Sequence, residues 1–365
     1  METANRRNRY CVIMCGGIGS RFWPMSRTDM PKQFLDMFGT GRSLLQQTYD
    51  RIRPLCDPEN ILLTTNVHYV DIIREQLPEI PAENILAEPA RRNTAPCICR
   101  AAYHIYARNP EASIINIPSD HLVLKENAFI EVLSQGMDFV EKGDRLLTIG
   151  LKPVSPHTGY GYIQLGATLD DPSGIRKVKS FTEKPDIEMA RTFLANGEFY
   201  WNSGMFLWRA DSIIKAFEQY APEINTLFSK ARDLIGTPGE AEYINTIYPS
   251  APNISVDYAV MEKARNVYVK TADIGWSDLE NWKVLYEISP KTMDGNVTQN
   301  CRVLASNSHG NIFAASGDKI MVVSGLDGFI VADTDQALMI CPVNDERRIR
   351  QVLNEVKEHF GEKFI

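Results

Sequence analysis

Between Tyr10 and Gly150 the chain alternates short apolar runs with amphipathic stretches, and this alternation constrains the fold more than any other feature. The apolar runs are YCVIMC, NILLTT, NILAE and SIINI, and the stretches between them include SLLQQTYDRI and APCICRAAYHIYAR. Alternation of this kind is typical of βαβ units in a parallel sheet that helices cover on both faces. Ser43 is the predicted N-cap of one helix, and Thr94-Ala95-Pro96 is the predicted start of another. The first half is therefore expected to be α/β.

The pattern changes at about Pro153. The segments GYGYIQLG and IRKVKSF alternate in polarity and predict antiparallel strands beside the parallel sheet. Helical periodicity returns in IEMARTFLANG, in 210–246, in DYAVMEKA and in LENWKVLYEI. From Gly295 to Ile340 short β-type segments follow one another without a fixed period, and a helical tail runs from Glu346 to Phe360. We expect a small C-terminal β domain.

Composition excludes several classes of protein. The 365 residues favour about two domains, and 44% hydrophobic residues are ample for packed cores. A net charge of -7 argues against nucleic acid as a partner. The longest apolar runs are far short of the ~18 residues that span a bilayer, and residues 1–10 lack a hydrophobic signal segment. We therefore expect a cytoplasmic protein with no membrane partner. Seven cysteines without a CxxC pair indicate reduced, mostly buried thiols, and the scattered histidines predict no structural zinc site.

A glycine-rich loop follows the first predicted strand. Gly16, Gly17 and Gly19 let backbone N–H groups approach a phosphate, and Arg21 and Lys32 add positive charge. Two standard nucleotide loops do not fit, because Trp23-Pro24 interrupts a dinucleotide-binding helix and a Walker GKS or GKT is missing. The pattern indicates one anionic ligand, and a glycine-rich turn with solvated arginines is the alternative.

The loop is followed by further motifs in a fixed order: Pro31-Lys32-Gln33, Glu88-Pro89, Asn93-Thr94-Ala95-Pro96, Pro118-Ser119-Asp120-His121, Gly159-Tyr160-Gly161-Tyr162, Phe181-Thr182-Glu183-Lys184-Pro185, Trp201-Asn202-Ser203-Gly204, Ser255-Val256-Asp257-Tyr258 and Gly275-Trp276-Ser277-Asp278. This series closely resembles the mannose-1-phosphate guanylyltransferases, also called GDP-mannose pyrophosphorylases. The resemblance implies a Rossmann-like nucleotidyltransferase fold of the glycosyltransferase-A type with a mixed sheet. It implies a catalytic domain over 1–290, and a short left-handed β-helix with a terminal helix over 291–365. The expected form is the single-function one, without a phosphomannose isomerase domain.

The resemblance also implies a reaction and its residues. GTP and mannose 1-phosphate give GDP-mannose and pyrophosphate, with Mg²⁺ held by Asp120 and Asp278. The implied catalytic residues are Arg21, Lys32, Asp120, Lys184 and Asp278. Nucleotide contacts fall on Gly16, Gly17, Gly19, Ser20, Arg21, Glu88, Asn93, Thr94, Ala95, Ser119 and Asp120. Sugar-phosphate contacts fall on Gly161, Glu183, Lys184 and Asn202. A homodimer through the β domain is expected.

Two of these assignments have a structural alternative. Asp278 before a helix is equally typical of an N-cap, and Glu183-Lys184 as a bare pattern is more typical of a solvated ion pair. His121 is given no catalytic role, and Trp201 and Phe206 are as typical of core as of a site.

Two departures from the family pattern, Arg91 near the base pocket and Glu280 near Asp278, leave base selectivity and local loop geometry open. The competing functions are another sugar-nucleotide pyrophosphorylase, a non-catalytic regulatory paralogue, and a hydride-transferring Rossmann enzyme.

Overall fold

The computed structural model describes residues 6–169, 173–317 and 319–365, and these fall into two compact units. The first unit comprises 1–16, 49–118 and 123–276, and the second comprises 17–48, 119–122 and 277–365. Each unit therefore combines segments that are distant in sequence. The expected division into a catalytic domain over 1–290 and a β domain over 291–365 stays a prediction.

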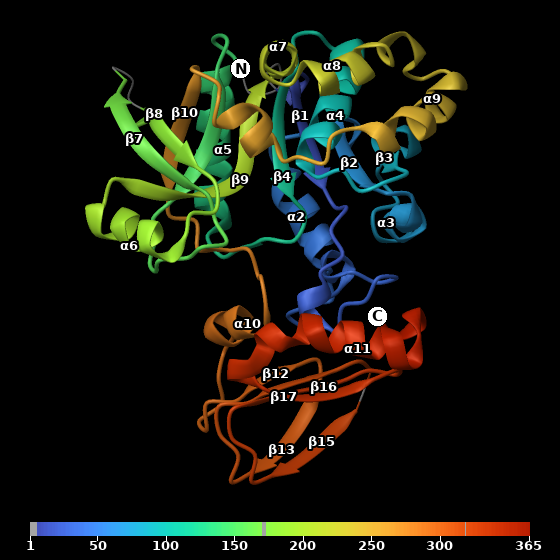
Figure 1. Ribbon diagram of the computed structural model, residues 1–365, viewed down its shortest axis with the longest axis vertical. Coiled ribbons are helices and arrows are strands. Elements are labelled where there is room, and N and C mark those ends of the chain that lie inside the picture. The colour runs from blue at the N-terminus through green and yellow to red at the C-terminus, as the bar shows by residue number, and fades with distance from the viewer. Residues whose placement is uncertain (1–5, 170–172, 318) are drawn as a thin grey trace. The chain divides into compact units, whose positions relative to one another are not determined.

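The first unit is built on a nine-stranded mixed sheet, as expected from the alternating pattern (Figure 1). Its order is β3-β2-β1-β4-β9-β6-β10-β8-β7, and β7 also pairs with β9. The strands are β1 (Arg9–Met14), β2 (Ile61–Asn66), β3 (Ile85–Glu88), β4 (Ser113–Pro118), β6 (Leu146–Leu151), β7 (Tyr162–Thr168), β8 (Arg176–Thr182), β9 (Phe199–Arg209) and β10 (Val267–Ala272). Two further strands, β5 (Leu122–Val123) and β11 (Trp276–Ser277), have two residues each.

The strand order of the parallel part of the sheet reverses at β1. Strands β2 and β3 extend it on one side of β1, and β4 pairs with β1 on the other. Met14 and Pro118, the last residues of β1 and β4, are register partners. Ligands of open α/β sheets bind outside the carboxyl ends of strands at such a switch point. The two strands that lead into the glycine loop and the Ser119-Asp120 motif therefore end side by side at the expected place.

The prediction of antiparallel strands after Pro153 is confirmed. Strands β7 and β8 pair antiparallel, with Tyr162 opposite Thr182, and β7 also runs antiparallel to β9. The GYGY motif leads into β7, the EKP motif directly follows β8, and the WNSG motif lies within β9, so the three motifs belong to neighbouring strands of one sheet or to their ends.

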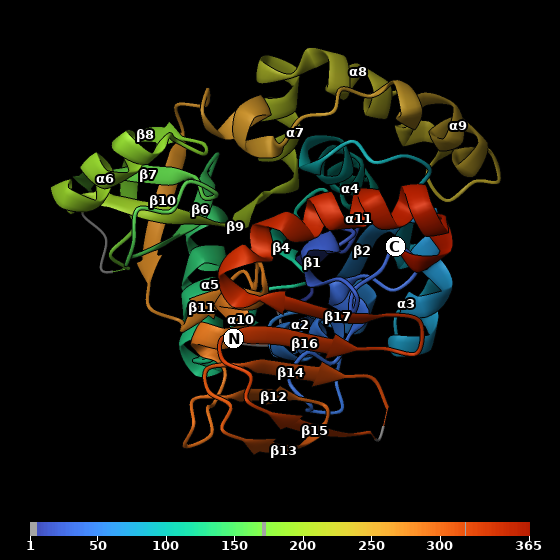
Figure 2. The ribbon, with the colours of Figure 1, turned by 60° about the horizontal axis from the view of Figure 1, so that its bottom comes forward.

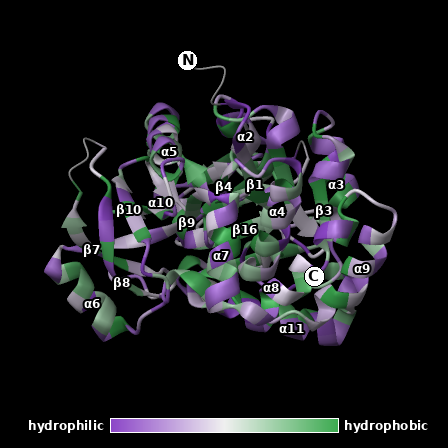
Figure 3. Ribbon diagram, turned by 90° about the horizontal axis from the view of Figure 1, so that it is seen from above, coloured by the Kyte–Doolittle hydropathy of each residue, from purple (hydrophilic) through white to green (hydrophobic). Residues whose placement is uncertain are grey.

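Helices cover both faces of the sheet. They are α3 (Val70–Gln76), α4 (Thr94–Arg108), α5 (Glu126–Val140), α6 (Ile187–Asn196), α7 (Ala210–Tyr220), α8 (Pro222–Ser229) and α9 (Gly239–Ile247). Helix α5 lies on one face and α4 and α7 lie on the other, and α5 shows both hydrophilic and hydrophobic segments (Figure 3). None of the described helices combines the length and the apolar character that a membrane crossing requires.

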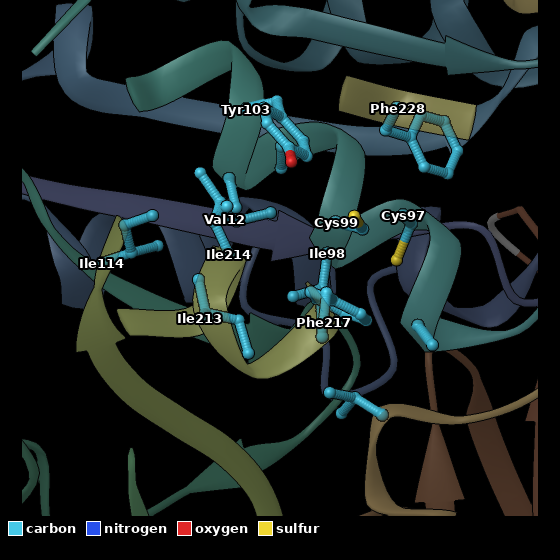
Figure 4. Packing of buried hydrophobic residues seen from close by; sticks show 14 of the residues in the cluster. Val12, Cys97, Ile98, Cys99, Tyr103, Ile114, Ile213, Ile214, Phe217 and Phe228 are labelled. Carbon is cyan, nitrogen blue, oxygen red and sulfur yellow. The ribbon is translucent and has the colours of Figure 1, made fainter. Parts of the chain in front are cut away.

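The main core of the first unit lies between the sheet and helices α4, α7 and α8. Val12 of β1 and Ile114 of β4 pack in one cluster with Ile98, Ile213 and Phe217 (Figure 4). Complete burial of a side chain such as Phe217 stabilises the fold by about 1.5–3 kcal/mol. Five of the seven cysteines are buried, as the sequence indicated. The helix predicted at Thr94 begins there, and Asn93 caps it by accepting a hydrogen bond from the Thr94 N–H.

The second unit contains the C-terminal strands. A four-stranded sheet has the order β12-β14-β16-β17, and β13 pairs with β15 (Figure 2). The strands are β12 (Val297–Gln299), β13 (Arg302–Ser306), β14 (Ile312–Ala315), β15 (Ile320–Ser324), β16 (Phe329–Asp333) and β17 (Leu338–Pro342). All of these pairs are parallel except β16 with β17.

Two helices flank these strands in the chain, α10 (Trp282–Ile288) before them and α11 (Ile349–Phe360) after them. A third helix, α2 (Leu44–Ile52), contributes its first residues to the second unit and its residues from Tyr49 onward to the first. Helix α2 begins where Ser43 was predicted to cap it, and the Ser43 hydroxyl accepts from the Gln46 N–H at 3.2 Å. Helix α11 begins three residues later than predicted, because Val343–Arg348 form a 3-10 segment instead. Ile349 of α11 joins a core with Ile312 of β14 and Ile330 of β16.

Candidate active site

A cavity of about 720 Å³ lies within the second unit. Its walls come from the loop after Gly17, the residues that follow β4, the segment before α10, and the C-terminal stretch that contains α11. Six residues predicted to form the site line it: Gly19, Ser20, Arg21, Lys32, Asp120 and Asp278. The structure therefore brings the glycine loop and both predicted metal ligands to one cavity.

The glycine loop has little room for side chains. Gly19 has a φ of 54° and precedes the 3-10 turn Ser20–Phe22. A Cβ there would lie 2.9 Å from both Lys32 Cγ and Ser26 Oγ. The Gln33 side chain fixes the loop further by donating from Nε2 to the Gly17 carbonyl at 2.7 Å. Glycine is therefore required at position 19 for its backbone conformation and for the close approach of Lys32.

Lys32 joins the two aspartate segments. Its Nζ atom lies 3.1 Å from Asp120 Oδ2 and donates to the carbonyl oxygens of Asp278 and Leu279 at 3.0 and 2.9 Å. Burial alone would raise the pKa of Asp120, but the charge and hydrogen bond of Lys32, together with the charge of His121 and a backbone hydrogen bond, outweigh burial and hold the pKa below its usual value. Asp120 is thus ionised at neutral pH.

Asp120 and Asp278 suit a hard divalent cation. Both are carboxylates that line the same cavity, and the N-cap role considered for Asp278 belongs instead to Asn281, whose side chain accepts from the Val284 N–H. Among the described residues, no group of three or more His, Cys, Asp or Glu side chains could hold a metal ion. Two carboxylates leave positions for phosphate oxygens and water, which is the usual arrangement for Mg²⁺ bound with a nucleotide.

Arg21 forms an ion pair with Glu280 in the same cavity. The sequence marked Glu280 only as a departure from the family pattern, and it gave no sign of this partner 259 residues away. An arginine expected to bind phosphate is therefore held by an acid of the protein itself.

The C-terminal stretch also contributes to the cavity, which sequence reasoning missed. Arg350, Leu353 and Asn354 of α11 line it together with Ile365. The Trp23 indole donates to the Phe364 carbonyl at 2.6 Å, and the Thr28 N–H donates to the Ile365 carbonyl at 3.1 Å. Only a helical tail was predicted from the sequence, and a helical pattern does not indicate a ligand.

A second group of predicted residues lies in the first unit, at the end of β3 and the start of α4. Glu88 is buried and accepts from the Tyr248 hydroxyl at 2.6 Å. Burial raises the pKa of Glu88 to about 7, although Tyr248 and Arg100 oppose the shift. A Cβ on Gly16 would lie 3.7 Å from the other carboxylate oxygen, Oε2. Glu88 and Gly16 are thus neighbours, as a shared ligand requires.

The Asn93–Ala95 segment is fixed by hydrogen bonds. Asn93 has a φ of 62°, the Thr94 hydroxyl accepts from the Val256 N–H at 2.9 Å, and the Ala95 N–H donates to the Ile254 carbonyl. Arg91, the departure near this segment, donates to the Tyr69 hydroxyl at 3.3 Å. Ser119, another predicted nucleotide contact, is buried in the second unit, where its carbonyl accepts from the Thr48 hydroxyl.

The predicted sugar-phosphate residues form a third group, also in the first unit. Lys184 Nζ lies 2.9 Å from Glu183 Oε1, and a Cβ on Gly161 would meet both Glu183 and Asn202. Burial lowers the pKa of Lys184, but the hydrogen bond and charge of Glu183 outweigh it and raise the pKa overall. Within the described chain, the buried Glu183 Oε2 has no hydrogen-bond partner. A buried acceptor left unpaired costs about 1–3 kcal/mol, so this atom suits a ligand hydroxyl.

Asp257 belongs to the same group, although the sequence singled out only its motif. It accepts from Asn202 Nδ2 at 2.8 Å, while Asn202 Oδ1 accepts from the Thr148 hydroxyl at 2.9 Å. Burial and the neighbouring charge of Glu183 raise the pKa of Asp257 to about 6. Trp201 and Phe206 are both buried, in agreement with a core role.

Comparison with known proteins identifies the class first. A family model described as nucleotidyl transferase matches residues 10–295. Mannose-1-phosphate guanylyltransferases of Escherichia coli K12 and Salmonella montevideo are 35% and 36% identical to this chain, over 95% of it and 73% of their own length. A crystal structure from Thermus thermophilus, described as a mannose-1-phosphate geranyltransferase, superimposes with a TM-score of 0.85 at 29% identity and covers 96% of this chain and 99% of its own. The chain belongs to the nucleotidyl transferase family and, within it, to the mannose-1-phosphate guanylyltransferases.

Proposed function

We propose that this protein transfers the GMP group of GTP to mannose 1-phosphate, forming GDP-mannose and pyrophosphate. The single observation that carries the proposal is the cavity that Asp120, Asp278, Lys32 and the glycine loop line together, in a chain of this family. No observation favours a different base or sugar, or a regulatory protein without activity.

The reaction is a displacement at the α-phosphorus of GTP. A phosphate oxygen of mannose 1-phosphate forms the new bond to this phosphorus, and the bond to the bridging oxygen of the β-phosphate breaks in line with it. The bonding electrons leave with pyrophosphate, so no covalent enzyme intermediate is required. The main barrier is repulsion between the two anions together with the charge that builds on the leaving oxygen.

The residues of the cavity would lower this barrier by supplying positive charge and hydrogen-bond donors. In the proposal, Lys32 and Arg21 meet phosphate oxygens of GTP, and the backbone N–H groups of the glycine loop approach them. Asp120 and Asp278 would hold Mg²⁺, which when bound supplies positive charge to the phosphate oxygens. Lys32 keeps Asp120 ionised before the substrate arrives.

The two groups in the first unit would provide selectivity. Guanine carries N1–H and N2–H₂ donors, and Glu88 and the carbonyls of the Asn93–Ala95 segment are acceptors for them. We assign the mannose hydroxyls to Glu183 Oε2, the buried acceptor that lacks a partner in the described chain, and to Asn202. Lys184, whose pKa is raised, would meet the sugar phosphate as a permanent cation.

We also propose that 1–290 form the catalytic domain and that 291–365 form a short left-handed β-helix with its terminal helix. The parallel registers support successive coils, because Val297 pairs with Ile312 and Ile312 with Ile330. Leu304, Ile320 and Val322 expose apolar side chains on the β13–β15 pair, and we assign a homodimer contact to this surface.

Product analysis tests the function. Purified protein incubated with Mg²⁺, GTP and mannose 1-phosphate should yield GDP-mannose and pyrophosphate in equal amounts, measured by anion-exchange chromatography and a coupled pyrophosphate assay. Tight binding of GDP-mannose without any turnover would instead support a regulatory protein.

A further inference from the structure

Three arginines and one lysine line the cavity of the second unit: Arg21, Arg27, Lys32 and Arg350. The first three are engaged by acids of the protein. Arg21 pairs with Glu280, Arg27 Nε lies 3.0 Å from Asp29 Oδ1, and Lys32 Nζ lies 3.1 Å from Asp120 Oδ2. A polyanion that contacts any of these cations must share it with a carboxylate or displace that carboxylate.

Arg350 differs from the other three. It is exposed, and no carboxylate of the described residues lies within ion-pair distance of it, whereas nearby Arg348 pairs with Asp345 at 3.6 Å. Arg350, Leu353 and Asn354 are spaced three and four residues apart, so they share one face of α11. The same helix contacts the Ser20–Phe22 turn of the glycine loop. Arg350 is thus held on the wall of the cavity beside the loop assigned to the triphosphate.

We propose that Arg350 binds the β- and γ-phosphates of GTP, the part of the nucleotide that leaves as pyrophosphate. This inference rests on the proposed function and adds a residue to its site. The guanidinium has paired N–H donors that match two phosphate oxygens, and contact with it breaks no ion pair among the described side chains. Arg350 lines the same cavity as Asp120 and Asp278, the two aspartates that would hold Mg²⁺.

Loss of Arg350 should affect the binding of pyrophosphate and GTP but not that of GDP-mannose, because GDP-mannose lacks the two phosphates that leave. Arg350→Ala should weaken binding of magnesium pyrophosphate and raise the KM for GTP, each by about 10- to 100-fold, the range expected for hydrogen bonds to a charged group. Affinity for GDP-mannose and the KM for mannose 1-phosphate should change less than twofold. Arg350→Lys, which keeps the charge but loses the paired donors, should fall between the wild type and Arg350→Ala.

The experiment is isothermal titration of the full chain with pyrophosphate and with GDP-mannose, each in the presence of Mg²⁺, followed by steady-state kinetics. Arg348→Ala is the matched control, since it removes an arginine from the same stretch that does not line the cavity. Equal pyrophosphate affinity in the Arg350→Ala and Arg348→Ala proteins would overturn the inference. Equal losses for pyrophosphate and GDP-mannose would also overturn it, because they would indicate a general structural effect.

Binding and turnover separate this inference from the proposed function. If the wild type made no GDP-mannose but Arg350→Ala still weakened pyrophosphate binding selectively, the phosphate contact would stand and the assigned reaction would fall. If the wild type turned over normally and Arg350→Ala left pyrophosphate binding unchanged, only the role of Arg350 would be rejected.

Discussion

Lys32 Nζ lies 3.1 Å from Asp120 Oδ2 and donates to the backbone carbonyl of Asp278 at 3.0 Å. One ammonium group therefore connects two aspartates that are 158 positions apart in sequence. Lys32 touches the side chain of Asp120 but the backbone of Asp278. A substitution at Asp278 can thus change the carboxylate while the hydrogen bond that orders its segment remains.

Asp278→Asn should lower turnover by at least about 100-fold with little change in Tm. The amide removes a charge that would hold Mg²⁺, and loss of several kcal/mol of transition-state stabilisation corresponds to this factor. The Lys32 hydrogen bond to the Asp278 carbonyl remains. Pyrophosphate release and thermal unfolding measure the two effects. Asp233→Asn, on an exposed 3-10 turn, is the control. If the Asp278→Asn enzyme were as active as this control, the assignment of Asp278 as a metal ligand would be wrong.

Gly161→Ala should raise the KM for mannose 1-phosphate about tenfold or more, with a smaller effect on the KM for GTP. The new methyl would overlap with Glu183 Oε2 and lie 3.3 Å from Asn202 Cβ, so the Glu183 carboxylate must turn away. A contact worth about 1.4 kcal/mol corresponds to a tenfold change in binding. Gly143→Ala is the matched control, since a Cβ there meets only Arg145 Nε at 3.9 Å. Parallel changes in both KM values would argue against a sugar site at Glu183.

The free energy of unfolding of the Glu88→Gln protein, minus that of the wild type, should be larger at pH 8.5 than at pH 5. The pKa of Glu88 is raised from 4.5 to about 7 in the folded state. Its contribution to stability is therefore fully present below pH 4.5 and is lost as the pH rises through 7. The difference in unfolding free energy between the two proteins should shift by about 2–3 kcal/mol across this range. Urea unfolding at both pH values tests this, and a constant difference would contradict the raised pKa.

Glu280→Gln should lower the KM for GTP by about two- to fivefold without changing the KM for mannose 1-phosphate. The substitution removes the ion pair between Arg21 and Glu280, so the triphosphate no longer competes with the Glu280 carboxylate for Arg21. The effect is modest because the Arg21 side chain is 37% exposed, and partly exposed ion pairs contribute about 0–1 kcal/mol. Initial-rate kinetics at low and high salt provide the measurement. A higher KM for GTP would show that Glu280 supports the nucleotide site instead.

Local patterns predicted the local structure well. Ser43 caps α2, and GYGYIQLG and IRKVKSF form the antiparallel strands β7 and β8, because capping and polarity alternation act within a few residues. The positions of the C-terminal strands were predicted from the sequence, but no fixed repeat length was found. The registers explain this, because Val297 pairs with Ile312, 15 residues later, whereas Ile312 pairs with Ile330, 18 residues later.

Long-range partners could not be predicted in this way. The Arg21–Glu280 pair and the position of Arg350 in the cavity depend on the tertiary fold. The sequence near Arg21 does not indicate Glu280 as a partner, and the sequence near Arg350 does not indicate a ligand. Asp278 was identified as a ligand only through the family motifs, because an isolated aspartate before a helix is equally typical of a cap. Asp120 also follows the apolar run SIINI, at the carboxyl end of a strand where open α/β sheets bind ligands. Whether these residues carry the roles assigned to them remains a prediction.

The central claim is that the protein joins GMP to mannose 1-phosphate, and a substrate matrix tests it most directly. Pyrophosphate release is measured with Mg²⁺ for GTP, ATP, UTP and dTTP, each paired with mannose 1-phosphate and with glucose 1-phosphate. The account predicts that GTP with mannose 1-phosphate has the highest kcat/KM by at least about tenfold, a difference of about 1.4 kcal/mol. A higher kcat/KM with another pair, or no release with any pair, would contradict it.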